Sequence, residues 1–337
     1  MTQIASSPVS ATFSPPPGRT VTVQFNNNML LPLLLGDHDR HLARVEQALG
    51  VRLSCRGNRI AIAGDAARVE VAQVTLQALW RRLERGDSVG KPEVEAAIRM
   101  ADVDTDPRLP LSDVPAIRTR KGAIGPRSPG QVTYMEALST HEMVFGIGPA
   151  GTGKTYLAVA QAVAMLQSGR VDRIVLSRPA VEAGERLGFL PGDMKDKVDP
   201  YLRPIYDALY DFMEGRMVER GLQTGMIEIA PLAFMRGRTL SKAAILLDEA
   251  QNATAMQMKM FLTRLGEGSR MMVNGDPTQI DLAPGQTSGL VQAVGLLSGL
   301  DSVGHVKFAH GDVVRHDLVR RIVEAYEKAG AQHGPAR

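Results

Sequence analysis

The sequence predicts an α/β protein in which a parallel sheet carries helices on both faces and follows a small α+β domain. Three observations lead to this prediction. From residue 131 onward, short aliphatic segments alternate with helical segments, a pattern typical of a parallel sheet covered on both sides. A glycine-rich loop at 148–155 joins one of these strands to a helix. Before residue 91 the order differs, because a two-strand hairpin lies between two helices.

Length and local composition predict the domain boundaries. A chain of 337 residues has room for about two domains of ~150 residues each. Proline and serine are frequent at the N-terminus, and proline recurs between the two expected domains, where helical period is weak. The expected segments are a disordered lead at 1–18, an α+β domain at 19–90, a linker at 91–130, an α/β core at 131–328 and a disordered tail at 329–337.

Hydrophobic periodicity places the individual elements. In the small domain the expected strands are 21–25, 51–55 and 59–63, and the expected helices are 40–49 and 66–84. A hairpin at 117–124, with basic residues Arg118, Arg120 and Lys121, is expected within the linker. In the core the expected strands are 143–147, 173–176, 226–229, 243–247, 270–273 and 305–308.

Composition excludes several classes of protein. Cys55 is the one cysteine, which excludes a disulfide framework and any multi-cysteine zinc site and favours a reducing compartment such as the cytoplasm. No apolar run approaches the ~18 residues of a membrane span, and the N-terminus lacks the pattern of a signal peptide. The net charge of +3 and the pI near 9.0 permit a polyanionic partner without requiring one.

Residues 148–155 match the pattern G-x-x-x-x-G-K-[ST], which predicts a phosphate-binding loop. Glycines let the backbone curl so that successive N–H groups face phosphate oxygens, and the N-terminus of the next helix adds partial positive charge. Lys154 is expected to reach the β- and γ-phosphates, and the Thr155 hydroxyl to bind Mg²⁺. A chance glycine-rich turn is the alternative, but the strand before the loop and the helix after it favour a nucleotide site. The expected nucleotide-binding residues are Gln131, Gly148, Pro149, Ala150, Gly151, Thr152, Gly153, Lys154, Thr155 and Tyr156.

An acidic pair supplies the second half of the expected site. The apolar strand 243–247 delivers Asp248 to the carboxyl edge of the sheet, where parallel sheets bind ligands. Asp248 is expected to hold Mg²⁺, and Glu249 to orient and deprotonate the water that attacks the γ-phosphate. Kinases with such a loop do not need the second carboxylate, so its presence favours hydrolysis. A capping or surface pair is the alternative for these two residues taken alone.

Two glutamines complete the set of candidates. Gln279, in the segment 275–279 after a core strand, is expected to hydrogen-bond the γ-phosphate or the attacking water, with an Asp-Pro turn as the equal alternative. Gln131 precedes the glycine-rich loop and is a candidate reader of adenine, because a carboxamide offers one donor and one acceptor to adenine N6 and N7.

The segments 131–134, 148–155, 248–252 and 275–279 resemble the N-terminal RecA-like core of superfamily 1 helicases. Three further segments, 177–192, 235–239 and 314–326, resemble those of the PhoH-like ATPases of the PhoL and YbeZ type. The resemblance extends over residues 21–326. It implies a RecA-like P-loop NTPase core with ATP and Mg²⁺ as cofactors, in a bacterial cytoplasmic protein connected with phosphate starvation and RNA metabolism.

The resemblance also implies partners. It implies ribosomal RNA maturation with an endoribonuclease of the YbeY type, and RNA helicase activity. The small N-terminal domain resembles a KH-type RNA-binding module, whose G-x-x-G clamp corresponds here to Gly36-Asp37-His38-Asp39. Because two carboxylates would repel a phosphate backbone, a KH-like docking or oligomerisation domain is an equal alternative.

Superfamily 1 helicases close the ATP site with an arginine from a second RecA-like domain, for which this chain has no room. We therefore hypothesise that a neighbouring subunit supplies the arginine, in a homo-oligomer that is hexameric by analogy. Such an arginine contributes a factor of roughly 10³ to 10⁵ in turnover. Arg315 and Arg238 are the catalytic candidates, beside Arg236 and Arg320, and Arg315 could instead act in cis.

The leading hypothesis is an ATP-hydrolysing motor that acts on RNA. A nucleotide-dependent ring scaffold that docks a nuclease without unwinding RNA is the alternative. A small-molecule kinase is disfavoured by the presence of Glu249 and Gln279.

Overall fold

The computed structural model describes residues 18–102, 116–179, 194–283 and 285–314, together with residues 319 and 322. The chain forms two compact units, residues 1–112 and residues 113–337. Most of the expected lead, at 1–17, and the expected tail, at 329–337, lie outside the described residues.

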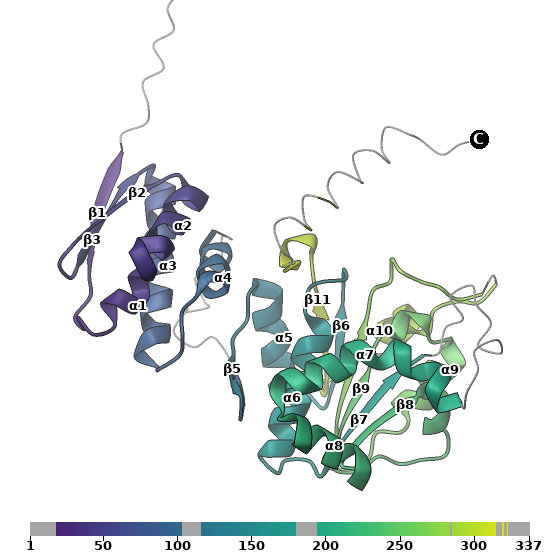
Figure 1. Ribbon diagram of the computed structural model, residues 1–337. Coiled ribbons are helices and arrows are strands. Elements are labelled where there is room, and N and C mark those ends of the chain that lie inside the picture. Colours follow the sequence, from purple (N-terminus) through teal and green to yellow (C-terminus); the bar gives the residue numbers. More distant parts are fainter. Residues whose placement is uncertain are drawn as a thin grey trace, which may run out of the picture. The chain divides into compact units, whose positions relative to one another are not determined.

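The N-terminal unit is an antiparallel sheet with helices packed on one face (Figure 1). The sheet order is β1-β3-β2, with β1 Arg19–Gln24, β2 Arg52–Arg56 and β3 Arg59–Gly64. The helices are α1 Leu31–Leu35, α2 Arg40–Leu49, α3 Ala66–Glu84 and α4 Lys91–Asp102. Alternate strand residues such as Val23, Ile60 and Ile62 are buried against these helices. The prediction of a small α+β region with an antiparallel sheet is confirmed.

Helix α4 corrects the prediction that the linker begins at residue 91, in a segment of weak helical period. Val94 and Ile98, one helical turn apart, are buried in the core of the N-terminal unit, and α4 packs on α3 and α2. Pro92 is compatible with this helix because proline is tolerated in the first helical turn. The proline-rich composition of the longer segment concealed this local pattern. The later part of the segment does form the expected hairpin, β4 Ile117–Thr119 and β5 Gly122–Ile124.

The C-terminal unit contains a six-stranded parallel sheet, as predicted. Its order is β11-β6-β10-β9-β7-β8, and every pair of neighbours is parallel. The strands are β6 Met143–Ile147, β7 Arg173–Arg178, β8 Ile227–Pro231, β9 Ala243–Leu247, β10 Arg270–Gly275 and β11 Val303–Lys307. The fully buried run of β9 is typical of a strand that is covered on both faces.

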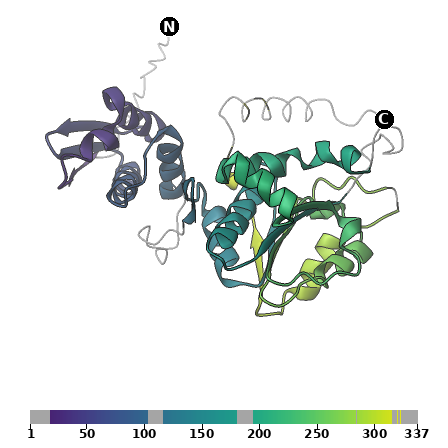
Figure 2. The ribbon, with the colours of Figure 1, turned by 60° about the horizontal axis from the view of Figure 1, so that its bottom comes forward.

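Helices cover both faces of this sheet (Figure 2). One face packs against α5 Pro129–Thr140, α6 Lys154–Gln167, α7 Met194–Phe212 and α8 Gly215–Thr224. The other face packs against α9 Ala255–Leu262 and α10 Gly289–Leu297. Within the described ranges, no helix has the length and apolar character needed to cross a membrane.

The strand order determines where a ligand can bind. The chain leaves β6 toward β7 on one side and later returns to β10, which lies between β6 and β9. In such sheets the loops after the carboxyl ends of the strands splay apart where the direction of winding reverses, and this leaves a crevice. The glycine-rich loop follows β6 and the acidic pair follows β9, so both reach this edge.

Candidate functional site

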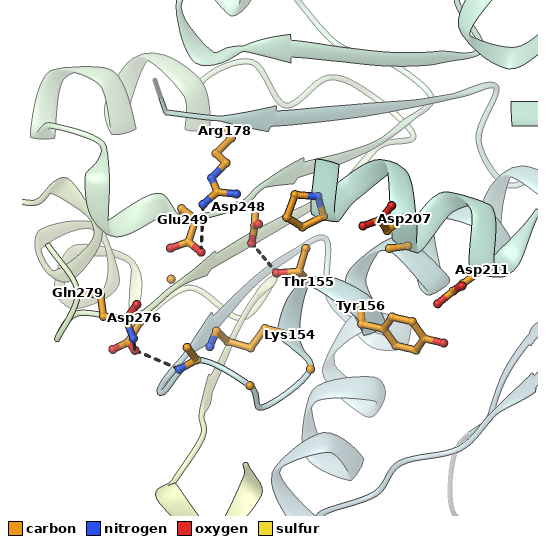
Figure 3. A pocket seen from close by; sticks show the side chains of 16 residues that line it. Lys154, Thr155, Tyr156, Arg178, Asp207, Asp211, Asp248, Glu249, Asp276 and Gln279 are labelled. Atoms are coloured by element: carbon orange, nitrogen blue, oxygen red, sulfur yellow. Dashed lines mark hydrogen bonds and ion pairs between the residues drawn. The ribbon is translucent and has the colours of Figure 1, made fainter. Parts of the chain in front are cut away.

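A cavity of about 490 Å³ lies at the carboxyl edge of the sheet (Figure 3). Its walls come from the loops after β6, β9 and β10, from the end of β7 and from helices α6 and α7. The predicted site residues that line it are Ala150, Gly151, Gly153, Lys154, Thr155, Tyr156, Asp248, Glu249 and Gln279. The site thus collects segments that are more than one hundred residues apart in the sequence.

Glycines shape the loop after β6. Gly151 and Gly153 have φ angles of 83° and 82°, a left-handed conformation that side chains with a Cβ disfavour. At Gly148 (φ 150°) a Cβ would lie 2.6 Å from the carbonyl oxygen of Phe308, so a larger residue would collide with the chain after β11. The glycines at these positions are therefore required by the backbone path.

Lys154 lies inside the curl of this loop. Its Nζ donates hydrogen bonds to the carbonyl oxygens of Gly148 (2.7 Å) and Pro149 (2.8 Å), and the residue is 9% exposed. Burial lowers the pKa of the ammonium group, whereas the neighbouring Asp276 and Asp248 carboxylates oppose that shift. A cation held in partial desolvation beside backbone N–H groups is suited to binding an anion.

Thr155 and Asp248 lie face to face at the floor of the cavity. The Thr155 hydroxyl donates to Asp248 Oδ1 at 2.6 Å, and Asp248 is 5% exposed. Burial raises the pKa of the Asp248 carboxyl, and the charge of Glu249 adds to the rise, while the Thr155 hydrogen bond opposes it. A buried carboxylate and a hydroxyl that converge in this way are the hard oxygen ligands that Mg²⁺ prefers.

Glu249 is fixed by two neighbours. Its Oε2 accepts a hydrogen bond from Gln251 Nε2 at 2.6 Å, and its Oε1 lies 3.5 Å from Arg178 Nη2. The residue has a φ of 52°, a left-handed conformation that costs free energy outside glycine and occurs at functional sites. This backbone turn lets Asp248 and Glu249 present adjacent carboxylates to the same cavity.

The loop after β10 connects the acidic pair to the glycine-rich loop. Asp276 Oδ2 accepts hydrogen bonds from the Ala150 N–H (3.1 Å) and from Gln279 Nε2 (3.0 Å). Gln251, which is 1% exposed, donates to the carbonyl oxygen of Gln279 and accepts from the N–H of Asp276. Partial burial raises the pKa of the Asp276 carboxyl, but hydrogen bonds from Thr278 and Ala150 outweigh this effect, and the pKa is lowered overall. The carboxylate form is therefore favoured.

Gln131 has partners other than the predicted one. It does not line the cavity. Its Oε1 accepts from the N–H of Arg127 at 2.7 Å, and its Nε2 donates to the carbonyl oxygen of Thr152 at 2.9 Å. Because both polar atoms bind the backbone, the geometry favours support of the glycine-rich loop over contact with adenine, which would require these bonds to open.

This geometry gives a prediction for Gln131→Ala. We expect the binding free energies of ATP and GTP to weaken by a similar amount, about 1–3 kcal/mol, because the backbone groups of Arg127 and Thr152 lose their hydrogen-bond partners. Calorimetric titration with both nucleotides measures it, and Gln223→Ala, at an exposed position on α8, is the control. A loss confined to ATP would instead support adenine recognition.

Of the predicted arginines, the two that the structure describes do not line this cavity. Arg238 donates two hydrogen bonds to Glu228, at 2.6 and 2.7 Å, and neither Arg238 nor Arg236 lines the cavity. Arg315, like Arg320, lies outside the described residues. A contribution of Arg238 to a neighbouring subunit stays a prediction, and it would require the ion pair with Glu228 to open.

The ion pair makes a prediction about stability. The hydrogen bond from Arg238 lowers the pKa of Glu228. The ion pair therefore contributes to the free energy of unfolding above the ordinary pKa near 4.5, and this contribution is lost as the pH falls through the lowered pKa. Because both side chains are about one third exposed, we expect Glu228→Gln to cost less than about 1 kcal/mol at neutral pH. Urea unfolding of both proteins from neutral pH down to about pH 3 measures this. A difference that grows in acid would contradict the assignment.

Several cavity residues were not predicted. Arg178 ends β7, and Asp207 and Asp211 lie one turn apart on α7. Gln251 does not line the cavity but connects two of its loops, and it was not predicted either. Arg178 is the arginine whose side chain lies beside Glu249 (Figure 3). One signal was available for Arg178, since it comes two residues after the predicted strand 173–176 and was therefore to be expected near the ligand-binding edge of the parallel sheet.

Comparison with known proteins identifies the family. A sequence model described as "PhoH-like protein" matches residues 123–327. The chain belongs to the PhoH-like family. This is a family of P-loop ATPases, which agrees with the loop, the sheet and the acidic pair described above.

Curated relatives support membership over most of the chain. A PhoH-like protein of Bacillus subtilis (strain 168) is 48% identical over 297 residues, which is 88% of this chain and 93% of the relative. A PhoH-like protein of Mycobacterium tuberculosis (strain H37Rv) is 49% identical over 297 residues, 88% of this chain and 84% of the relative. Protein PhoH of Escherichia coli (strain K12) is 46% identical over 202 residues, 59% of this chain and 57% of the relative. The PhoH-like match thus includes the N-terminal unit in some relatives.

Proposed function

We propose that this PhoH-like protein binds ATP and hydrolyses it in a Mg²⁺-dependent reaction, and that it acts in RNA metabolism. One observation carries the proposal for ATP. A glycine-rich loop with an enclosed lysine, a buried Asp248 and an adjacent Glu249 open into the same cavity. Within the residues that the structure describes, this is a set of groups suited to hold a triphosphate and to activate a water molecule.

The residues present fit a magnesium ion. Asp248 is a buried carboxylate whose burial raises its pKa, so a cation beside it would compensate the charge. Asp248 and Thr155 would hold Mg²⁺, which would supply positive charge to stabilise the phosphates of the nucleotide. One carboxylate and one hydroxyl are sufficient protein ligands, because Mg²⁺ usually takes its other ligands from phosphates and water.

The residues of the site then have separate roles. The N–H groups of the glycine-rich loop and Lys154 bind and orient the phosphates. Glu249 accepts a proton from the attacking water at its carboxylate, and Gln279 holds the water or the γ-phosphate in line. Gln251 keeps Glu249 and the loop of Gln279 at a fixed distance.

Tyr156 is the proposed contact for the nucleoside. The residue is 41% exposed and lines the cavity, and its ring packs against Phe212 with ring centroids 4.6 Å apart. Burial and the Asp211 carboxylate raise the pKa of the phenol, so the ring stays neutral. A ring that is held by a tilted contact with Phe212, at an interplanar angle of 60°, and that borders the cavity suits contact with a base.

The proposed role in RNA metabolism rests on the helicase-like motifs of the sequence, and includes an endoribonuclease of the YbeY type as partner. The experiment is an assay of phosphate release from ATP by the full chain alone, with RNA, and with the nuclease. We expect basal turnover that depends on Mg²⁺ and rises with RNA or with the nuclease. Turnover that neither partner changes would contradict the RNA role, and absence of turnover in every arm would contradict the ATPase.

A homo-oligomeric ring with shared sites is the remaining part of the proposal. Its test is to mix a Lys154→Ala variant with an Arg238→Ala or Arg315→Ala variant. Two inactive parents that regain ATP turnover on mixing would support an arginine supplied in trans. Co-assembly without recovery would reject it and leave Arg178, which lines the cavity of its own chain, as the arginine of the site.

A further inference from the structure

The outer face of the N-terminal sheet carries a group of arginines. Strand register places nine side chains on the face opposite the helices, in three rows across the strands. The rows are Thr20–Ala63–Arg52, Thr22–Ala61–Ser54 and Gln24–Arg59–Arg56. We call Arg52, Arg56 and Arg59 the arginine face. All three are exposed, and no described element of the N-terminal unit packs on this side of the sheet.

These arginines lack the partners that other arginines of the unit have. Arg40, Arg44 and Arg68 form ion pairs with Asp37, Glu95 and Asp102, respectively. Within the described part of the chain, Arg52, Arg56 and Arg59 form no ion pair, and no acidic residue occupies any of the nine positions.

The arrangement is unfavourable for folding. Arg56 and Arg59 are directly opposed across the two strands at the hairpin turn, and like charges at opposed positions destabilise a sheet. No described side chain of the unit forms an ion pair with Arg56 or Arg59 to offset this repulsion, whereas an anion laid across the face would offset it.

The chemistry of the face favours a phosphate backbone. Guanidinium groups bind phosphate through paired hydrogen bonds, and Arg52 lies four residues from Arg56, about 13 Å along the strand. Thr22, Ser54 and Ala61 lie between them and are small, so an extended chain can approach the backbone closely. A protein partner would be expected to find an apolar centre, and the exposed large hydrophobic residues of the unit, Met29 and Leu33, lie outside the sheet.

We propose that the arginine face binds the phosphate backbone of single-stranded RNA. The choice of RNA rests on the proposed function, but the site itself rests on the charges of the face. Because the nine positions include no aromatic side chain on which bases could stack, binding is independent of base sequence. The loop 36–39, which the sequence suggested for this purpose, carries the exposed carboxylates of Asp37 and Asp39 and is a poor anion site.

The test is binding of a fluorescent 20-nucleotide oligouridine to the full chain, measured by anisotropy at several salt concentrations. In the variant Arg52→Gln/Arg56→Gln/Arg59→Gln, we expect affinity at low salt to fall by about tenfold or more, as expected for three lost phosphate contacts. The slope of log K against log salt should become shallower by about 2, since each contact on a single strand contributes roughly 0.7. The triple Arg→Lys variant should keep most of the slope, because the charges remain.

Controls separate this site from a general effect of charge. Arg216→Gln/Arg220→Gln/Lys259→Gln removes the same charge from exposed positions of the other unit and should leave the slope unchanged. The Arg→Gln variant of the arginine face and this control variant should unfold at temperatures no lower than that of the parent and should keep its RNA-free ATP turnover. Loss of RNA binding is then distinguishable from failure of the ATPase. Equal losses in both variants, an unchanged slope, or displacement of RNA by polyglutamate as readily as by unlabelled RNA would overturn the inference.

Discussion

Glu249→Gln is expected to abolish ATP hydrolysis while ATP binding persists. The carboxylate lines the cavity and is held by Gln251 and Arg178, so it is oriented before any substrate enters. Glutamine has almost the same size and can keep a hydrogen bond, but it cannot accept the proton of the attacking water. A positioned general base contributes roughly 10²–10⁴ in rate, and we expect a fall in kcat of that size.

The measurement is phosphate release at saturating ATP, together with the ATP dissociation constant from calorimetry. Glu136→Gln, at an exposed position on α5, is the matched control and should have the turnover of the parent. Normal turnover in Glu249→Gln would contradict the role of this residue as the general base.

Arg178→Ala is expected to lower kcat by a factor of about 10³, near the lower limit for an arginine that stabilises the charge of phosphoryl transfer. The guanidinium lines the cavity, contacts Glu249 and counters the raised pKa of Asp248. Removing it both releases the catalytic carboxylate and withdraws positive charge from the place where the γ-phosphate would lie.

Two further variants make this prediction specific. Arg178→Lys should recover only part of the rate, because an ammonium group keeps the charge without the planar fork. The effects of Arg178→Ala and Glu249→Gln should not add in the double variant, because the two side chains are in contact. Unchanged kcat in Arg178→Ala, with a loss confined to unfolding temperature, would show that this arginine is structural.

Local signals were sufficient to predict much of the fold. The strands 143–147 and 243–247 and the helix 66–84 agree with β6, β9 and α3, since an apolar run or a capped amphipathic segment is readable from neighbouring residues. Asp65 illustrates this, because it accepts hydrogen bonds from the N–H groups of Ala67 and Arg68 and so fixes the start of α3. The order of the six strands was not predictable, because buried parallel strands have similar apolar sequences.

In the site, too, contiguous motifs were predictable from the sequence and contacts between distant segments were not. The glycine-rich loop and the acidic pair are contiguous motifs, and the structure brings both to one cavity. Contacts between distant segments escaped the sequence: Asp276 binds the Ala150 N–H across 126 positions, and Gln131 binds the loop instead of facing the cavity. For Arg178 the one signal was its place after a predicted strand, which puts it near the ligand-binding edge but does not separate it from other residues of that edge.

The central claim is that the cavity beside Lys154 binds a nucleoside triphosphate. Calorimetric titration of the full chain with ATP and Mg²⁺ tests it most directly. The account predicts saturable binding of one ATP per chain in the parent and in Glu249→Gln, and loss of binding in a folded Lys154→Ala variant. A folded parent that gives no binding heat with millimolar ATP and Mg²⁺, or a Lys154→Ala variant that binds as well as the parent, would contradict it.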